Sequence, residues 1–190
     1  MSLSALLLRG LYRHTDIHLA IFFSVNDVTF SPQGTMLATC SSDGSTVLWD
    51  LLTGQKLVTF IQPSRLGVRV CRFSPNASFL LTGGDDDSFC VWDISSGCLK
   101  TSYPDHGATI FAADFTPDGE NIITADANGD VWLWSLANTK CLIHIEQAHD
   151  LGVLSLDFCP ERDADSVGNW EDTGAIQNEY ELATSGNDDR

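Results

Sequence analysis

The apolar residues of this chain fall in short runs of four to six residues, and turn-forming residues separate these runs. Residues 57–60, 99–103 and 141–145 are examples, rich in Val, Ile, Leu, Phe and Thr. No long stretch repeats apolar residues at the 3.6-residue spacing of an amphipathic helix. Short runs of such residues bounded by turns are typical of strands. The pattern therefore predicts an all-β protein.

A tripeptide that begins with Phe and ends with Pro recurs along the chain. It occurs at 30–32, 73–75, 115–117 and 158–160, which gives steps of 43, 42 and 43 residues. The tryptophans follow the same period, at Trp49, Trp92 and Trp134. A unit of about 42 residues with four short strands is the size of one β-propeller blade.

Each copy places the same residue types at the same offsets. A threonine follows the proline by seven residues, at Thr39, Thr82 and Thr124. Four residues later the copies have Asp43, Asp86 and Asn128, and the tryptophan follows after six more. In this arrangement the sequence resembles the WD-repeat family, over roughly residues 20–190.

The resemblance implies an all-β WD-repeat β-propeller that is incomplete, with about three full blades and a truncated fourth. The blades are expected near residues 21–62, 63–104, 105–147 and 148–190. Residues 1–20 do not repeat the pattern and are expected to form an N-terminal tail or an outer strand. Because the fourth copy stops before the position of the repeated tryptophan, we expect a fragment of a longer protein or an incomplete gene model.

In WD-repeat proteins a Trp, a Ser or Thr, an Asp and a His form a hydrogen-bonded group in each blade. The resemblance implies this role for Thr39, Asp43, Trp49, Thr82, Asp86, Trp92, His106, Thr124, Asn128, Trp134, His149, Thr184 and Asp188. The match is incomplete, since Ile21 and Ser64 stand at the His position of the first two copies. Asn128 replaces Asp in the third copy, so we expect a weakened network there. Trp132 is expected to face the opposite side of its strand from Trp134.

Several residues are candidates for contacts with a partner. In related propellers partners often touch the residue just before the turn Asp, and the matching residues here are Ser42, Asp85, Ala127 and Asn187. Arg65 and Arg69 could bind an acidic or phosphorylated motif, with solvated charges as the alternative. An acidic loop at residues 161–179 interrupts the fourth copy. It is either a docking element with Trp170 as its apolar anchor or a tolerated loop.

The composition narrows the function classes. The net charge of −16 argues against general nucleic-acid binding, because an acidic surface repels phosphates. The six cysteines lack Cys-x-x-Cys spacing and are expected to be buried thiols, with disulfides or a metal as the alternative. The apolar run at residues 6–8 is too short to span a membrane. We therefore expect an intracellular protein, cytoplasmic or nuclear.

No catalytic or cofactor motif is present. The chain has no P-loop, nucleophile elbow or metal-ligand spacing. The carboxylates of Asp85, Asp86 and Asp87 could hold a hard cation, but Asp86 falls on the turn position, which favours a turn. We expect no enzyme activity, no cofactor and no small-molecule substrate, and expect proteins or peptides as partners.

A closer resemblance suggests one kind of assembly. Several stretches are similar to the propeller part of the family of WD repeat, SAM and U-box domain-containing proteins: residues 30–49, 62–64, 68–75 and 148–152. This resemblance implies a non-catalytic scaffold, the substrate- or partner-binding propeller of a U-box-type ubiquitin ligase. Ligase activity in protein ubiquitination would then belong to a U-box that these residues do not contain.

The alternative is a propeller subunit or substrate receptor of another multiprotein complex, such as a cullin-type ligase or a signalling scaffold. Cullin-ligase receptors of this kind often carry an Arg two residues after Trp-Asp. Here Leu52 and Ser95 stand in that place, which weakens this alternative.

Overall fold

The computed structural model describes residues 23–103, 106–158 and 182–186, and every regular element in these residues is a β-strand. Sheet I contains β1 (Val25–Phe30), β2 (Met36–Ser41), β3 (Ser45–Asp50) and β4 (Lys56–Ile61). Sheet II contains β5 (Val68–Phe73), β6 (Phe79–Gly84), β7 (Phe89–Asp93) and β8 (Cys98–Tyr103). Sheet III contains β9 (Ile110–Phe115), β10 (Asn121–Asp126), β11 (Val131–Ser135) and β12 (Cys141–Ile145). Sheet IV contains β13 (Val153–Phe158) and β14 (Leu182–Gly186).

Neighbouring strands within each sheet are antiparallel and follow chain order. The turns between them are tight, as in Ser31–Gly34, where the Gly34 N–H donates to the Ser31 carbonyl over 2.8 Å. Short strands joined by such turns form the four-stranded blade of a propeller. The predicted all-β fold is confirmed, with three four-stranded blades and a partial fourth.

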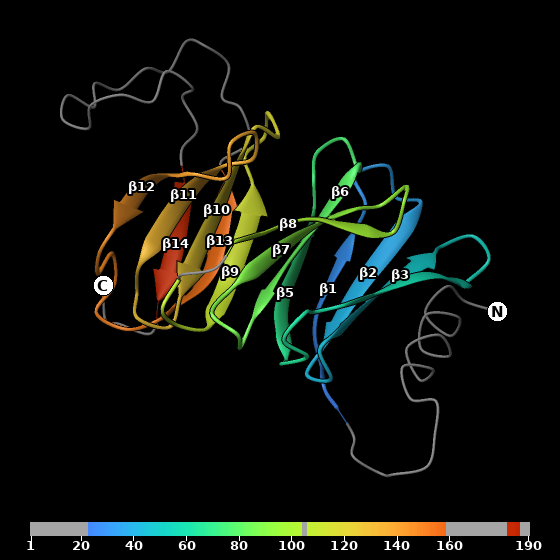
Figure 1. The fold of residues 1–190 in the computed structure, drawn as a ribbon, viewed down its shortest axis with the longest axis horizontal. Helices are drawn as coiled ribbons and strands as arrows, with labels where there is room; N and C mark the ends of the chain where they lie inside the picture. The colour runs from blue at the N-terminus through green and yellow to red at the C-terminus, as the bar shows by residue number, and fades with distance from the viewer. Residues whose placement is uncertain (1–22, 104–105, 159–181, 187–190) are drawn as a thin grey trace.

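The sheets stack face to face in chain order, from sheet I to sheet IV (Figure 1). The first strands of the sheets lie beside one another, since β1 packs against β5, β5 against β9, and β9 against β13. These four strands are the innermost of their sheets, and β4, β8 and β12 are the outermost. A crossover loop therefore runs from the outermost strand of one sheet to the innermost strand of the next.

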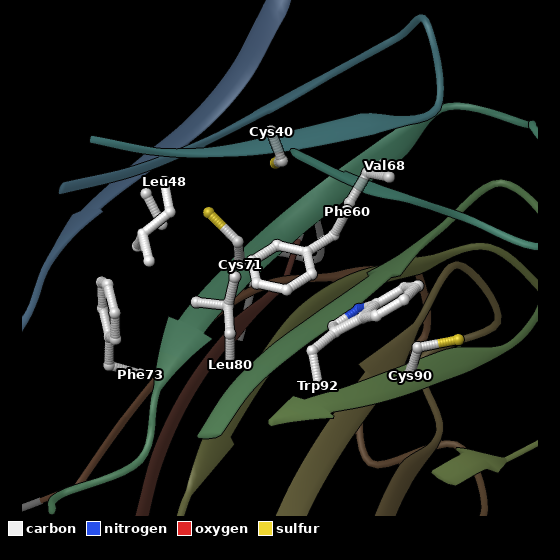
Figure 2. Packing of buried hydrophobic residues seen from close by; sticks show 10 residues of the cluster. Cys40, Leu48, Phe60, Val68, Cys71, Phe73, Leu80, Cys90 and Trp92 are labelled. Atoms are coloured by element: carbon white, nitrogen blue, oxygen red, sulfur yellow. The ribbon is translucent and has the colours of Figure 1, made fainter. Parts of the chain in front are cut away.

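Apolar side chains fill the space between consecutive sheets. Figure 2 shows the layer between sheets I and II, where the rings of Phe60 and Trp92 lie 5.2 Å apart. The layer between sheets II and III holds Phe89, Tyr103 and Trp134, and the first two rings stack at 4.2 Å. Each tryptophan of sheets II and III thus faces the preceding sheet. Burial of such large side chains is the main force that holds blade on blade.

Two expectations about single residues are wrong. Trp132 lies on the same side of β11 as Trp134, and their rings stack at 5.4 Å with planes 15° apart. The reason is the two-residue side-chain period of a strand, which brings residues i and i+2 to one face. Cys98 and Cys141 are exposed, because they begin the outer strands β8 and β12, whereas Cys40, Cys71 and Cys90 are buried thiols.

The phenylalanine that begins each Phe-x-Pro tripeptide has a different solvent exposure in each sheet. Phe30, Phe73 and Phe115 end the innermost strands of their sheets at the same register position. Phe73 packs against sheet I and is 7% exposed, and Phe115 packs against sheet II and is 3% exposed. Phe30 is 57% exposed. The contribution of this Phe to stability therefore depends on the preceding sheet.

Truncation of the buried copy should be costly and truncation of the exposed copy should not. We expect Phe73→Ala to lower the free energy of unfolding by about 3–5 kcal/mol, because it leaves a cavity between two sheets. Phe30→Ala should change it by about 0.5 kcal/mol or less. Urea unfolding of both variants measures the difference. Equal losses would contradict the proposed packing order.

Candidate functional site

Two sets of loops meet at one end of the stacked sheets, which we call the crossover face. It consists of the crossover loops 62–67, 106–109 and 146–152 and of the turns between the second and third strands of each sheet. One hydrogen bond recurs between them. The backbone N–H of Ser42, Asp85 or Ala127 donates to a carbonyl of the chain that leads into the innermost strand, at 3.0, 2.9 and 2.9 Å respectively. Three of the predicted partner-contact residues are thus equivalent and share one face.

A glycine in the turn lets the crossover loop approach closely. Gly44 has a φ of +82°, and a Cβ built on it would lie 2.9 Å from the carbonyl carbon of Arg65. Gly129 has a φ of +89°, and its Cβ would lie 2.1 Å from the carbonyl oxygen of His149. Side chains at these positions would have both strain and a backbone clash. The two loops are therefore held as one surface.

The network in sheet I links its second and third strands. The Trp49 indole N–H donates to Thr39 Oγ1 over 3.0 Å. Asp43 lies in the turn, where its carboxylate accepts from the N–H and the hydroxyl of Ser45 at 2.8 and 2.6 Å. A carboxylate that accepts from nearby turn groups fixes the turn conformation.

In sheet II a glutamine makes the connection expected of a histidine. The Trp92 indole donates to Thr82 Oγ1 at 2.8 Å, and the Thr82 hydroxyl donates to Gln62 Oε1 at 3.1 Å. Gln62 Nε2 donates to Asp86 at 3.2 Å, and the Ser64 hydroxyl donates to the same carboxylate at 2.6 Å. An amide offers both an acceptor and a donor, as a neutral imidazole does. Gln62 thereby joins the crossover loop to sheet II.

Sheet III holds a complete network, which corrects the expectation of a weakened one. Trp134 donates to Thr124 Oγ1 at 2.9 Å, and His106 Nε2 lies 2.5 Å from the same oxygen. His106 Nδ1 lies 3.1 Å from the carboxylate of Asp126, and all these side chains are buried. The acid of this blade is therefore Asp126, two residues before Asn128. Asn128 contributes its backbone N–H, which donates to Asp126 over 2.9 Å.

These distances fit one set of proton positions. Because the Trp134 N–H already donates to Thr124, the Thr124 hydroxyl can donate to Nε2 of His106. His106 then carries its proton on Nδ1 and donates to Asp126. Burial alone would raise the pKa of Asp126, but hydrogen bonds from His106 and from backbone N–H groups outweigh it and lower that pKa.

Sheet IV begins the same network. His149 Nε2 lies 2.7 Å from Thr184 Oγ1, which joins the crossover loop to β14. The predicted network residue Asp188 lies outside the described residues, as do the predicted partner contacts Asn187 and Trp170.

Gln62 and Asp126 are the two network residues that sequence reasoning missed. Gln62 lies one residue past β4, and the sequence signal for it is a side chain that can both donate and accept at the start of a crossover. Asp126 lies at the end of β10, two residues after Thr124. In the first two copies the acid stands four residues after the threonine, and in the third copy Asn128 occupies that position. The repeat pattern therefore gave no sign that an acid two residues after the threonine reaches the same turn.

The predicted partner-contact residues differ in whether their side chains already bind other groups of the chain. Arg69 makes a two-pronged ion pair with Asp85, with nitrogen to oxygen distances of 2.7 and 3.0 Å. Asp85 raises the pKa of the Arg69 guanidinium through this hydrogen bond. The Ser42 hydroxyl donates to Asn26 over 3.1 Å. Arg65 is exposed at a φ of 59°, so its side chain projects from a fixed backbone. Arg65 and Arg69 thus do not act as one free basic pair.

Charged side chains also line up across the innermost strands. Arg72 of β5 pairs with Asp27 of β1, and Asp27 also accepts the Cys71 N–H over 3.1 Å. The pKa of Asp114 on β9 is raised to about 6, mainly by burial and to a smaller extent by the charge of Asp157 on β13, against the opposing effects of the Phe115 N–H and of Arg72. The ion pair joins sheets I and II at their inner edge.

The described residues contain no group of three or more His, Cys, Asp or Glu side chains that could hold a metal ion. Asp85 instead forms the ion pair with Arg69, and Asp86 belongs to the hydrogen-bond network of sheet II. Asp87 lies in the turn with a φ of 55°. No helix among these residues is long and apolar enough to cross a membrane.

The repeat units match a family model described as "WD domain, G-beta repeat", at residues 13–50, 54–93 and 97–135. The chain belongs to the WD-repeat family. In the WD-repeat units 54–93 and 97–135, the outermost strand of one sheet is followed by the first three strands of the next. Each unit therefore contains one crossover with its hydrogen-bond network.

Curated relatives share a short part of this WD-repeat chain. The human "WD repeat, SAM and U-box domain-containing protein 1" is 50% identical over 48 residues, which is 25% of this chain and 10% of the relative. The chicken protein of the same name is 44% identical over 48 residues, with the same coverage. The matches thus span about a tenth of each relative.

Solved structures share the fold. "Structure of U3-55K" and "Crystal structure of RRP9 WD40 repeats" each have a TM-score of 0.67 and 16% identity. Each match covers 75% of this chain, with 44% and 43% of the two solved chains. At this identity the likeness supports the propeller fold alone. Membership of the WD-repeat family indicates a general role as a protein-interaction scaffold.

The network of sheet III gives a sharp test of which acid matters. Asp126→Ala should destabilise the protein by about 1–3 kcal/mol, because it leaves a buried His106 donor and two turn N–H groups without their acceptor. The matched control Asn128→Ala should cost about 0.5 kcal/mol or less, because that side chain is exposed. Denaturant unfolding of both variants measures the difference. A larger loss for Asn128→Ala would contradict the assignment.

The inner-strand carboxyl Asp114 predicts a pH dependence. Its pKa of about 6 in the folded protein exceeds the ordinary aspartate pKa of 3.8, so the folded state holds the proton more tightly. This stabilisation is full below pH 4 and is lost as the pH rises through 6. Asp114→Asn should remove that part of the slope in a series of urea midpoints between pH 4 and 7.

Proposed function

We propose that this chain is the partner-binding propeller of a U-box-type ubiquitin ligase, acting as a non-catalytic scaffold in protein ubiquitination. The single observation that carries the ligase part is the 50% identity over 48 residues to the human relative, whose name includes a U-box domain. The scaffold part is supported by the WD-repeat match and by the fixed crossover face. Ubiquitin transfer would be the work of a U-box outside these residues.

The crossover face is the part of the chain proposed to meet the partner. Its turns and crossover loops are hydrogen bonded to each other in each full blade, so a partner would meet a surface that needs little ordering. Leu66 and Leu151, at equivalent places in two crossover loops, are both about half exposed. Leu66 follows Arg65 in the chain, and Leu151 follows Asp150. Exposed leucines beside charges suit an amphipathic peptide or a protein loop.

Other parts of the proposal rest on composition. A net charge of −16 disfavours a nucleic-acid partner, and proteins or peptides are the expected ligands. Asn187 and Trp170 remain predicted contacts of the same partner. We propose an intracellular location, in the cytoplasm or the nucleus, where a ubiquitin ligase would act.

The second candidate is a subunit or substrate receptor of another multiprotein complex. The general scaffold role and the fold support it equally well. Leu52, which is exposed in the turn after β3, and Ser95 both lack the guanidinium expected of a cullin-ligase receptor. The U-box assembly therefore remains the better supported of the two.

The ligase proposal can be tested on the assembly isolated from cells through a tag on this protein. The assembly should discharge a ubiquitin-charged conjugating enzyme and modify the proteins that it retains. Arg69→Glu should repel Asp85, disturb the crossover face and lower modification of retained proteins at least several-fold, while discharge to free lysine is unchanged. Leu52→Asp, at the other end of sheet I, should leave both unchanged. Absence of any discharge activity would refute the ligase role and favour the second candidate.

A further inference from the structure

The sequence contains three lysines, and each belongs to the first part of an outermost strand. Lys56 begins β4, Lys100 is the third residue of β8, and Lys140 directly precedes β12. Each of these strands ends where a crossover loop begins, so the start of the strand lies toward the opposite end of its sheet. We call the three side chains the lysine rim.

The crossover face, by contrast, carries no lysine. Neither its crossover loops nor the turns between the second and third strands contain one. The guanidinium groups at this face are those of Arg65 and Arg69, and Arg69 is held by Asp85. A guanidinium stays protonated and does not act as a nucleophile. An acyl group attached to a lysine is therefore placed at the rim, about the 17–20 Å length of a strand away from the crossover face.

The three amines of the lysine rim differ in what lies beside them. All three lysines are exposed. Lys100 Nζ lies 3.7 Å from the centroid of the Phe79 ring, which attracts its positive charge. Among the described residues, Lys56 and Lys140 have neither a carboxylate nor a ring in contact with the amine. Lys100 must give up its ring contact before the amine can react, whereas the other two amines can react directly.

Attachment of ubiquitin to a protein needs an amine of this kind. The neutral ε-amine attacks the thioester carbonyl carbon of a ubiquitin-charged conjugating enzyme, so that a C–N bond forms and the C–S bond breaks. The proton that the amine loses passes to the departing thiolate. A scaffold that belongs to a ubiquitin ligase is itself within reach of the charged conjugating enzyme.

We propose that the lysine rim is the ubiquitin-acceptor site of this chain, with Lys56 and Lys140 as the main acceptors. This inference rests on the proposed ligase role. The observation that carries it is the separation of the three lysines from the crossover face. Because the attached ubiquitin projects from the opposite end of the sheets, the scaffold retains its partner while it is modified.

The experiment maps attachment on the assembly isolated from cells through a tag on this protein. The assembly is incubated with a ubiquitin-charged conjugating enzyme, and the glycine–glycine remnant left by trypsin is located by mass spectrometry. Lys56 and Lys140 should each carry several-fold more remnant than Lys100, whose amine is held over a ring. Partner proteins should be retained equally by modified and unmodified molecules.

Two sets of variants test the acceptors themselves. The combined change of Lys56, Lys100 and Lys140 to Arg should lower modification within residues 1–190 at least about tenfold, because a guanidinium is not an acceptor. Discharge to free lysine should be unchanged in this variant. Phe79→Leu should raise the modification of Lys100 several-fold, because leucine keeps an apolar side chain at this place but removes the ring face.

A matched pair of added lysines tests the separation from the crossover face. Arg65→Lys places an ε-amine on that face and keeps the positive charge, so molecules modified there should lose their partner. Gln55→Lys places an ε-amine at the rim, beside Lys56, at a site that is also exposed. Molecules modified at this residue should retain the partner as well as unmodified molecules do.

The outcomes separate the inference from the ligase proposal. Loss of all discharge to free lysine would refute the ligase role and the acceptor site with it. With discharge intact, the inference alone would be overturned by an absence of remnant within residues 1–190. It would equally be overturned by remnant mainly on Lys100, by attachment that persists in the triple Arg variant, or by loss of the partner from molecules modified at Lys56 or Lys140.

Discussion

The chain of hydrogen bonds from tryptophan through threonine to a crossover residue is the constraint on which this structure depends. One hydrogen bond of the chain joins two strands of a sheet, and the next joins that sheet to the crossover loop. Trp134 and Thr124 lie on neighbouring strands of sheet III, whereas His106 belongs to the crossover that arrives from sheet II. A buried network of this kind is stable only when every member is satisfied. It therefore fixes the place where one sheet ends and the next begins.

The same constraint can be met by different side chains. Gln62 in sheet II and His106 in sheet III each offer one acceptor and one donor, and each connects a threonine to a carboxylate. The carboxylate comes from the turn in one case and from the end of β10 in the other. In sheets II and III the fold requires a side chain at the crossover that accepts one hydrogen bond and donates another. The residue type is secondary to that requirement.

The proposed scaffold function depends on the side chains that the turns and crossover loops expose at the surface. The turns and crossover loops are fixed to each other by backbone hydrogen bonds, so their exposed side chains form a steady surface at one end of the sheets. Such loops on a rigid scaffold are where binding residues concentrate. Apolar layers join the sheets and keep these loops in place relative to one another.

The sequence by itself determined the fold class, the number of repeats and the tryptophan and threonine of the networks in sheets I to III. Those features depend on local patterns, namely strand-length apolar runs and a period of about 42 residues. Only the tertiary structure decided which acid serves sheet III, that Gln62 replaces a histidine, and that Arg69 pairs with Asp85. These choices depend on side chains that are 16 to 20 residues apart and that meet where a crossover loop or an innermost strand lies beside the turn of the same sheet. Residue type and spacing along the chain do not specify such contacts, because they form only when the folded strands and loops come together.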